Sequence, residues 1–162
     1  MNERQRLFFD KESRRLLDAG EIRKMDSFIQ HGNITCLKHS MDVARGSYAL
    51  ACRLRLRVDS RALIRGALLH DYFLYDWHEK DRSHRLHGFR HPGFALANAR
   101  RHFRLTPIEE DIIKKHMWPL TVVPPTCREA AIVCLVDKYC STRETVSGIK
   151  RRIWRPMTGW QS

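Results

Sequence analysis

The chain has 162 residues, and 30 lysines and arginines against 18 aspartates and glutamates give it a formal net charge of +12 at pH 7. This length predicts one domain with a hydrophobic core, and 30% charged with 43% hydrophobic residues exclude a disordered chain. The longest strongly apolar run, residues 130–136, is far shorter than the roughly 20 residues of a membrane-spanning helix. The positive charge predicts either an anionic partner or a solvated basic face.

The first residues and the cysteines predict a cytoplasmic protein. Residues 1–6 are rich in charge and no apolar stretch follows them, so we expect no signal peptide. The cysteines are odd in number and form no CxxC pair, which favours reduced thiols: Cys36, Cys52, Cys127, Cys134 and Cys140. We expect no association with a membrane.

Helix signals dominate the first half of the chain, and no stretch alternates with the period of a strand. The predicted helices there span, in order, residues 3–19, residues 21–30, from about residue 35 to past residue 52, and residues 61–70. Gly20 ends the first helix, the break at His31-Gly32-Asn33 ends the second, and Asp59 is the candidate N-cap of the fourth.

The second half continues the helical pattern. Pro92 fits the first turn of a helix that runs to about residue 103. Thr106 and Glu109 form a capping-box pattern before the next helix, and Thr126 and Glu129 repeat it before the last one. Residues 76–90 form a long irregular polar connection, of the kind that often carries function. Together these elements predict an all-α protein.

Histidines and aspartates end or interrupt the apolar helix faces at three places. His39 lies one to two turns into its predicted helix, and the pair His70-Asp71 closes the apolar run of residues 67–69. Asp137 follows the apolar run of residues 130–136. An ionised carboxylate beside such a run is costly unless a cation or hydrogen-bond donors compensate its charge.

Two further histidines belong to this set. His91 precedes Pro92 at a helix entrance, and His116 lies on the apolar stripe of Ile112 and Ile113. A lone histidine on such a face is more often a hydrogen-bonded core residue, and a lone aspartate a cap or an ion-pair member. Their combined order, however, favours a shared divalent cation bound by His39, His70, Asp71, His91, His116 and Asp137.

This order resembles the His…His-Asp…Asp signature of the HD-domain metal-dependent phosphohydrolases. The motifs that carry the resemblance are residues 38–44, 66–71 and 136–138. The resemblance implies a single all-α HD domain over residues 1–162, with a core of about 28–145, a helical N-terminal extension of 1–27 and a basic tail of 146–162.

The resemblance implies that His39, His70, Asp71 and Asp137 bind one divalent metal. His91 and His116 occupy the places of two extra histidines in the dinuclear branch, which is shared with cyclic-dinucleotide phosphodiesterases and in which the doublet aspartate, here Asp71, bridges two ions. The chain departs from that branch in lacking the GYP triplet. One or two ions are expected; Fe, Mn, Mg, Zn, Co and Ni are not distinguished, with Fe or Mn favoured for a pair.

The resemblance implies hydrolysis of a phosphate ester, and the ligand types fit this chemistry because water on such a metal ionises near neutral pH. The expected substrate is a nucleotide or another phosphorylated metabolite, cleaved by a phosphomonoesterase or a phosphodiesterase. Asp71 would act in catalysis as well as in binding, and Asp76 and His78 are candidates for supporting the ligands or transferring protons.

Three basic residues are candidates for binding the substrate phosphate: Lys80, Arg90 and Lys138. For Lys138, a solvated surface position is an equal alternative. The competing hypothesis for the whole chain is a non-catalytic HD-fold module that senses a nucleotide or RNA, which the net charge of +12 motivates. The sequence does not predict the oligomeric state.

Overall fold

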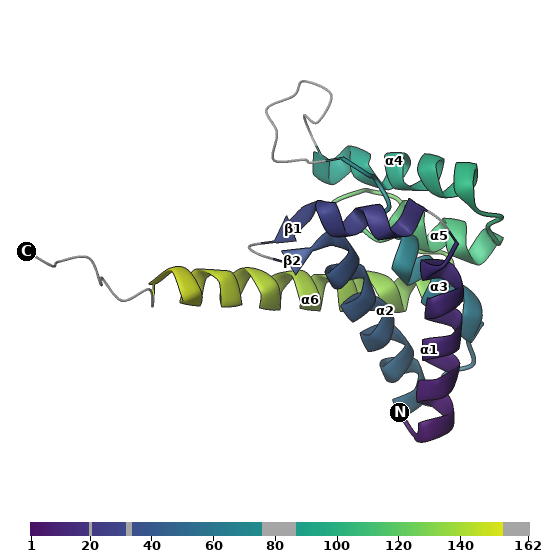
Figure 1. Ribbon diagram of the computed structural model, residues 1–162. Coiled ribbons are helices and arrows are strands. Elements are labelled where there is room, and N and C mark those ends of the chain that lie inside the picture. The colour runs from purple at the N-terminus through teal and green to yellow at the C-terminus, as the bar shows by residue number, and fades with distance from the viewer. Residues whose placement is uncertain (20, 32–33, 76–86, 154–162) are drawn as a thin grey trace, which may run out of the picture.

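The computed structural model describes residues 1–19, 21–31, 34–75 and 87–153. Helices make up most of these residues, and two short strands join them (Figure 1). In chain order the elements are α1 (Glu3–Leu17), the 3₁₀ helix η1 (Glu21–Ser27), β1 (Ile29–His31), β2 (Ile34–Thr35), α2 (Cys36–Arg53), α3 (Ser60–Leu69), α4 (His87–His102), α5 (Pro107–Lys115) and α6 (Arg128–Ile153). The prediction of a helical fold is confirmed.

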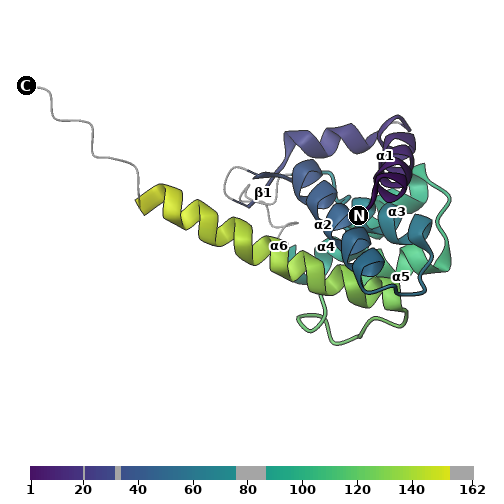
Figure 2. The same ribbon diagram turned by 90° about the horizontal axis from the view of Figure 1, so that it is seen from below.

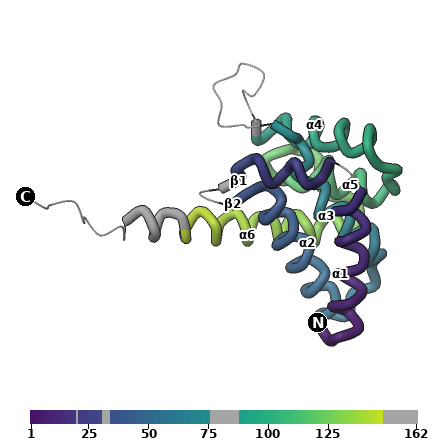
Figure 3. The backbone as a smooth tube through the Cα atoms, in the orientation of Figure 1, coloured from purple at the N-terminus to yellow at the C-terminus, as the bar shows by residue number. Residues whose placement is uncertain are grey.

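Helix α3 is the centre of the arrangement, because it packs against α1, α2, α5 and α6. Its side chains Leu63, Ile64, Leu68 and Leu69 are fully buried, as its apolar sequence requires. Helix α6 packs along α2 and α5, and its C-terminal part extends away from the other helices (Figures 1 and 2). After α4, the backbone returns to α3 first with α5 and then with α6 (Figure 3).

The segment predicted as a helix over residues 21–30 is instead a short 3₁₀ helix followed by a strand. Ile29 pairs antiparallel with Thr35, and His31 pairs with Ile34, so that β1 and β2 form a small hairpin. The prediction was wrong here because a short apolar run fits the periodicity of a helix and that of a strand equally well. The β-branched residues on both sides of the break at residues 31–33 favour strands. The hairpin contacts α2 and α6.

Three predicted helix starts are confirmed by their caps. The side chains of Thr35, Asp59 and Thr106 each accept a hydrogen bond from a backbone N–H of the first turn. Helix α4, in contrast, begins at His87, so that Pro92 lies inside it and residues 87–90 are helical. The prediction of an irregular connection over residues 76–90 is therefore wrong for residues 87–90. Residues 76–86 lie outside the described residues.

The capping box predicted before the last helix is wrong. Glu129 turns away from Thr126, and its Oε1 accepts a hydrogen bond from the backbone N–H of Asp59 at 2.7 Å. The Asp111 carboxylate of α5 takes its place and accepts from the N–H groups of Thr126 at 2.8 Å and Cys127 at 3.2 Å. Tertiary partners replace the local cap, and these contacts fasten the start of α6 to α3 and α5.

In the part of the chain that the structure describes, every helix is too short or too polar to cross a bilayer.

Candidate metal centre

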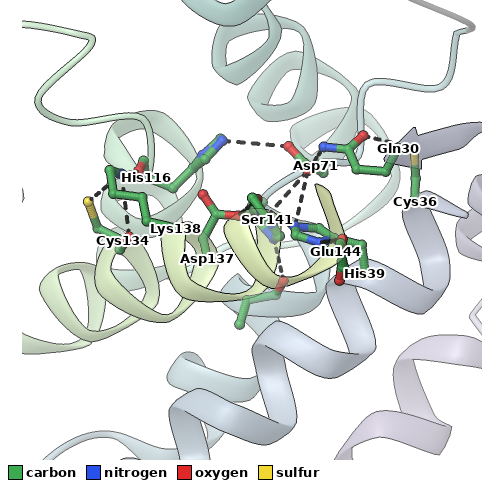
Figure 4. Close-up of polar contacts among 12 residues, drawn as sticks. Gln30, Cys36, His39, Asp71, His116, Cys134, Asp137, Lys138, Ser141 and Glu144 are labelled. Carbon is green, nitrogen blue, oxygen red and sulfur yellow. Dashed lines mark hydrogen bonds and ion pairs between the residues drawn. The ribbon is translucent and has the colours of Figure 1, made fainter. Parts of the chain in front are cut away.

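His39 lies in the second turn of α2, and both of its ring nitrogens meet carboxylates of α6. Its Nε2 is 3.0 Å from Asp137 Oδ1, and its Nδ1 is 3.0 Å from Glu144 Oε2. Asp137 and Glu144 are seven residues apart, which places both on one face of α6. The approach of α6 to α2 therefore creates this half of the centre (Figure 4).

His70 is the C-cap residue of the buried helix α3, and Asp71 follows it directly. The His70 ring bonds the carbonyl of its own helix, with Nδ1 2.7 Å from Ala67 O. Its Nε2 consequently faces the centre, 3.4 Å from Asp71 Oδ2 and 3.7 Å from Asp137 Oδ1. The end of α3 thus presents one nitrogen and one carboxylate to the same point.

His91 of α4 and His116 at the end of α5 meet on the other side of Asp71. Their Nε2 atoms are 2.7 Å apart, and they lie 3.2 Å and 3.5 Å from Asp71 Oδ1. His116 Nδ1 is held by Ile113 O at 2.9 Å, the same local arrangement that holds His70. Helix α4 and the end of α5 therefore aim two imidazoles at one carboxylate oxygen.

The two oxygens of Asp71 divide the centre into two groups. Oδ2 faces His70 and, at 3.8 Å, His39 Nε2, whereas Oδ1 faces His91 and His116. Two overlapping sets offer ligand atoms that all lie within 4.8 Å of one another: His39, His70 and Asp137, and His70, Asp71 and His116. The structure thus brings together all six residues predicted as metal ligands, and all six are buried.

The two aspartates are held in their ionised form. Burial opposes the charge of Asp71, but the adjacent His70 imidazole outweighs it and holds the pKa of the carboxyl well below its usual range. Burial likewise opposes the charge of Asp137, whose pKa is lowered by its contacts with His39 and His70. Two buried carboxylates that stay ionised at one point create a strong attraction for cations.

The imidazoles respond to these charges in opposite ways. Burial disfavours a charged His39, but its hydrogen bonds to Asp137 and Glu144 prevail and raise its pKa to about 9. The pKa of His70 is raised well above its usual value, because the attraction of Asp71 prevails over burial. Burial and the neighbouring His70 lower the pKa of His116 to about 3. Positive charge therefore gathers between the two aspartates.

Two atoms at the middle of the cluster lack a hydrogen bond within the described part of the chain: His70 Nε2 and Asp71 Oδ1. Buried polar atoms are nearly always bonded, since an unpaired one costs about 1–3 kcal/mol. Both atoms are ligand types for a borderline divalent metal, and the partners on Nδ1 leave the Nε2 atoms of His70 and His116 facing inward. The residues present therefore fit a divalent cation.

Three residues of the centre escaped the sequence reasoning: Gln30, Ser141 and Glu144. Gln30 Nε2 donates to Asp71 Oδ2 at 2.6 Å, and its own Oε1 accepts from the Cys36 thiol at 3.2 Å (Figure 4). Ser141 Oγ donates to Asp137 Oδ1 at 3.2 Å. The helical spacing from Asp137 was a signal for Ser141 and Glu144, whereas Gln30 reaches the centre only through the hairpin.

The predicted phosphate-binding residues fall in different places. Lys138 Nζ donates to the backbone oxygen of His116 at 2.9 Å and contacts Cys134 Sγ at 3.2 Å (Figure 4). Arg90 is exposed on α4, with its guanidinium carbon 5.5 Å from the centroid of the Phe94 ring. Asp76, His78 and Lys80 lie outside the described residues. A role for any of these in binding or catalysis stays a prediction.

Comparison with known families gives one match. The model of the HD domain matches residues 36–142, which is more than half of the chain. The matched range begins with α2, contains all six clustered residues and ends inside α6. No curated protein and no solved structure matches the chain.

Proposed function

The chain belongs to the HD-domain family, and from this premise we propose that it is a metal-dependent phosphohydrolase. The proposed substrate is a phosphate ester of a nucleotide or of another phosphorylated metabolite. Membership of the family and the buried cluster of imidazoles and carboxylates support the proposal. The excess of positive charge supports an anionic substrate.

The observation that carries the proposal is the pair of unbonded atoms at the centre, His70 Nε2 and Asp71 Oδ1. A histidine that merely filled the core would have both ring nitrogens hydrogen-bonded. Here the backbone bonds His70 through Nδ1 and leaves Nε2 facing two ionised carboxylates. A divalent cation between these atoms would supply the partner that His70 Nε2 and Asp71 Oδ1 lack.

The two carboxylate oxygens of Asp71 face different residues, which indicates which residues would hold each ion. His39, His70 and Asp137 would hold one with the Oδ2 side of Asp71, and His91 and His116 would hold a second with the Oδ1 side. When bound, divalent cations polarise a phosphate ester and lower the pKa of bound water to near neutral pH. The surrounding side chains orient the six candidate ligand residues and keep bulk water from them, since all six candidate ligands are buried.

Arg90 remains a candidate for binding the substrate phosphate. It is exposed on α4 and directly precedes His91 in the sequence. Lys138 instead supports the backbone of His116, and through it the position of that ring. Asp76, His78 and Lys80 remain candidates for proton transfer and phosphate binding.

Metal analysis combined with a hydrolysis screen tests the proposal. Protein purified without an affinity tag is analysed element by element, then assayed on nucleotides and phosphorylated metabolites with Mn²⁺, Fe²⁺, Mg²⁺ or Ni²⁺. We expect bound metal and hydrolysis that His70→Ala and Asp71→Ala abolish. A metal-free protein that hydrolyses nothing after supplementation would refute the proposal. Salt-sensitive RNA binding that survives both substitutions would instead favour a non-catalytic sensing module.

A further inference from the structure

Glu144 is a buried carboxylate that the six-ligand pattern does not include. It is 7% exposed and lies two helical turns beyond Asp137, on the same face of α6. Its Oε2 is 3.0 Å from His39 Nδ1, and its Oε1 has no hydrogen bond within the described part of the chain. Helix α6 therefore meets both nitrogens of one imidazole, with Asp137 on Nε2 and Glu144 on Nδ1 (Figure 4).

His39 differs from His70 and His116 in what is available to bond its Nδ1. His70 and His116 end their helices, where carbonyl groups are unpaired, and each bonds a carbonyl three residues earlier. His39 lies in the second turn of α2, where the carbonyl groups are bonded within the helix. A side chain from another element must therefore supply its acceptor.

We propose that Glu144 is a positioning residue, which fixes His39 in the tautomer with its proton on Nδ1 and its lone pair on Nε2. The proposal rests on the proposed function, because it assigns Glu144 a role in binding the metal. When a metal is bound at Nε2, the single N–H of a neutral imidazole lies on Nδ1, where the Glu144 carboxylate is placed to accept it. Such outer partners commonly raise the metal affinity of the ligand they orient.

The test compares zinc binding by variants of Glu144 with a matched variant on the same helix. In Glu144→Leu the acceptor is lost, whereas in Glu144→Gln the amide oxygen still accepts from Nδ1. Glu129 is the control, because it lies on α6, is also 7% exposed and bonds the backbone of Asp59 away from the centre. Titration calorimetry with Zn²⁺ measures affinity, and thermal denaturation of the metal-free proteins measures stability.

We expect Glu144→Leu to weaken Zn²⁺ binding by about 10- to 100-fold, and Glu144→Gln to restore most of the affinity. Glu129→Leu should lower stability and leave the affinity unchanged. A folded Glu144→Leu protein that binds Zn²⁺ as tightly as the wild type would overturn the inference, as would a loss of affinity that Glu129→Leu reproduces. A purely structural carboxylate would give either of these results.

A second measurement uses only the wild-type chain and does not depend on the variants folding. In the zinc-loaded protein, nitrogen-15 NMR should show His39 protonated on Nδ1. Protonation on Nε2 would overturn the inference while the proposed function stands. A wild-type protein that binds no Zn²⁺ would overturn the inference together with the metal site, so the two failures are distinguishable.

Discussion

His91 and His116 place their Nε2 atoms 2.7 Å apart, although one side chain comes from α4 and the other from the end of α5. A hydrogen bond between two imidazole nitrogens uses a single proton, so one ring donates and the other accepts. Both nitrogens also lie within 3.5 Å of Asp71 Oδ1. The pair is therefore arranged as two nitrogens around one carboxylate oxygen, apart from the group that contains His39.

Replacing His91 or His116 by alanine should remove one of two bound ions. The group of His39, His70 and Asp137 remains intact in these variants, so we expect one equivalent of metal where the wild type holds two. Element-resolved metal analysis per chain checks this, with His102→Ala as the control because His102 bonds Tyr72 outside the centre. Retention of two equivalents, or a wild type with one, would contradict the assignment of His91 and His116.

Gly66→Ala should destabilise the protein by about 1–3 kcal/mol, since it overpacks the α3–α5 contact. A Cβ at Gly66 would lie 2.5 Å from Ile112 Cδ1 and 3.1 Å from Ile112 Cβ. Urea denaturation measures the effect. These two helices carry His70 and His116 at their ends, so we also expect weaker metal binding.

Gly93→Ala is the matched control, because a Cβ there meets nothing within 4 Å. Gly93 lies inside α4, where alanine favours the helix by up to about 1 kcal/mol. Equal losses in both variants would show that close helix contact is not the reason for glycine at position 66.

Asp111 should make stability depend on pH in the acid range. Partial burial opposes its ionisation, but hydrogen bonds from Lys115, Thr126 and Cys127 prevail and lower its pKa to about 2 from 3.8. A carboxyl with a lowered pKa in the folded state adds stability that is present above the ordinary pKa. That stability is lost as the pH falls from about 4 through 2.

Comparing wild type with Asp111→Asn from pH 7 to pH 2 by urea denaturation checks this dependence. The wild type should be the more stable protein at neutral pH, and the difference should shrink below pH 4. The same change at the exposed residue Asp10 on α1 serves as the reference. A difference that stays constant down to pH 2 would show that the Asp111 contacts do not depend on its charge.

Chelation of the metal should lower the melting temperature. A ligand that binds only the folded state, at 100 times its dissociation constant, adds about 2.7 kcal/mol to the free energy of unfolding. We expect EDTA to remove this increment from the wild type and to leave Asp71→Asn almost unchanged, since that variant lacks the shared ligand. Identical melting curves for the wild type with and without EDTA would argue against a resident cation.

Local signals explain what the sequence could predict. The caps Thr35, Asp59 and Thr106 act on their own first turns, so their residue types predict α2, α3 and α5 directly. The order of the six clustered residues was also visible, because aspartates and histidines that end apolar runs are rare without compensation.

Contacts between distant segments explain what it could not. Glu129 bonds Asp59, 70 positions away, instead of capping its own helix. Gln30 reaches Asp71 only because a hairpin replaces the predicted helix end. In each case the local pattern fits two structures, and packing against another element selects between them.

The long separation of His39 from Asp137 has a consequence for how the protein matures. These residues are 98 positions apart, and Asp137 belongs to the last helix of the described chain. Contacts between residues so far apart in the sequence form late, because the entropy cost of closing a large loop comes before any stabilisation from the contact. In the proposed metal site, the nascent chain therefore cannot bring Asp137 to His39 until α6 has docked, and we expect tight binding of an ion to mark the completion of folding rather than its beginning.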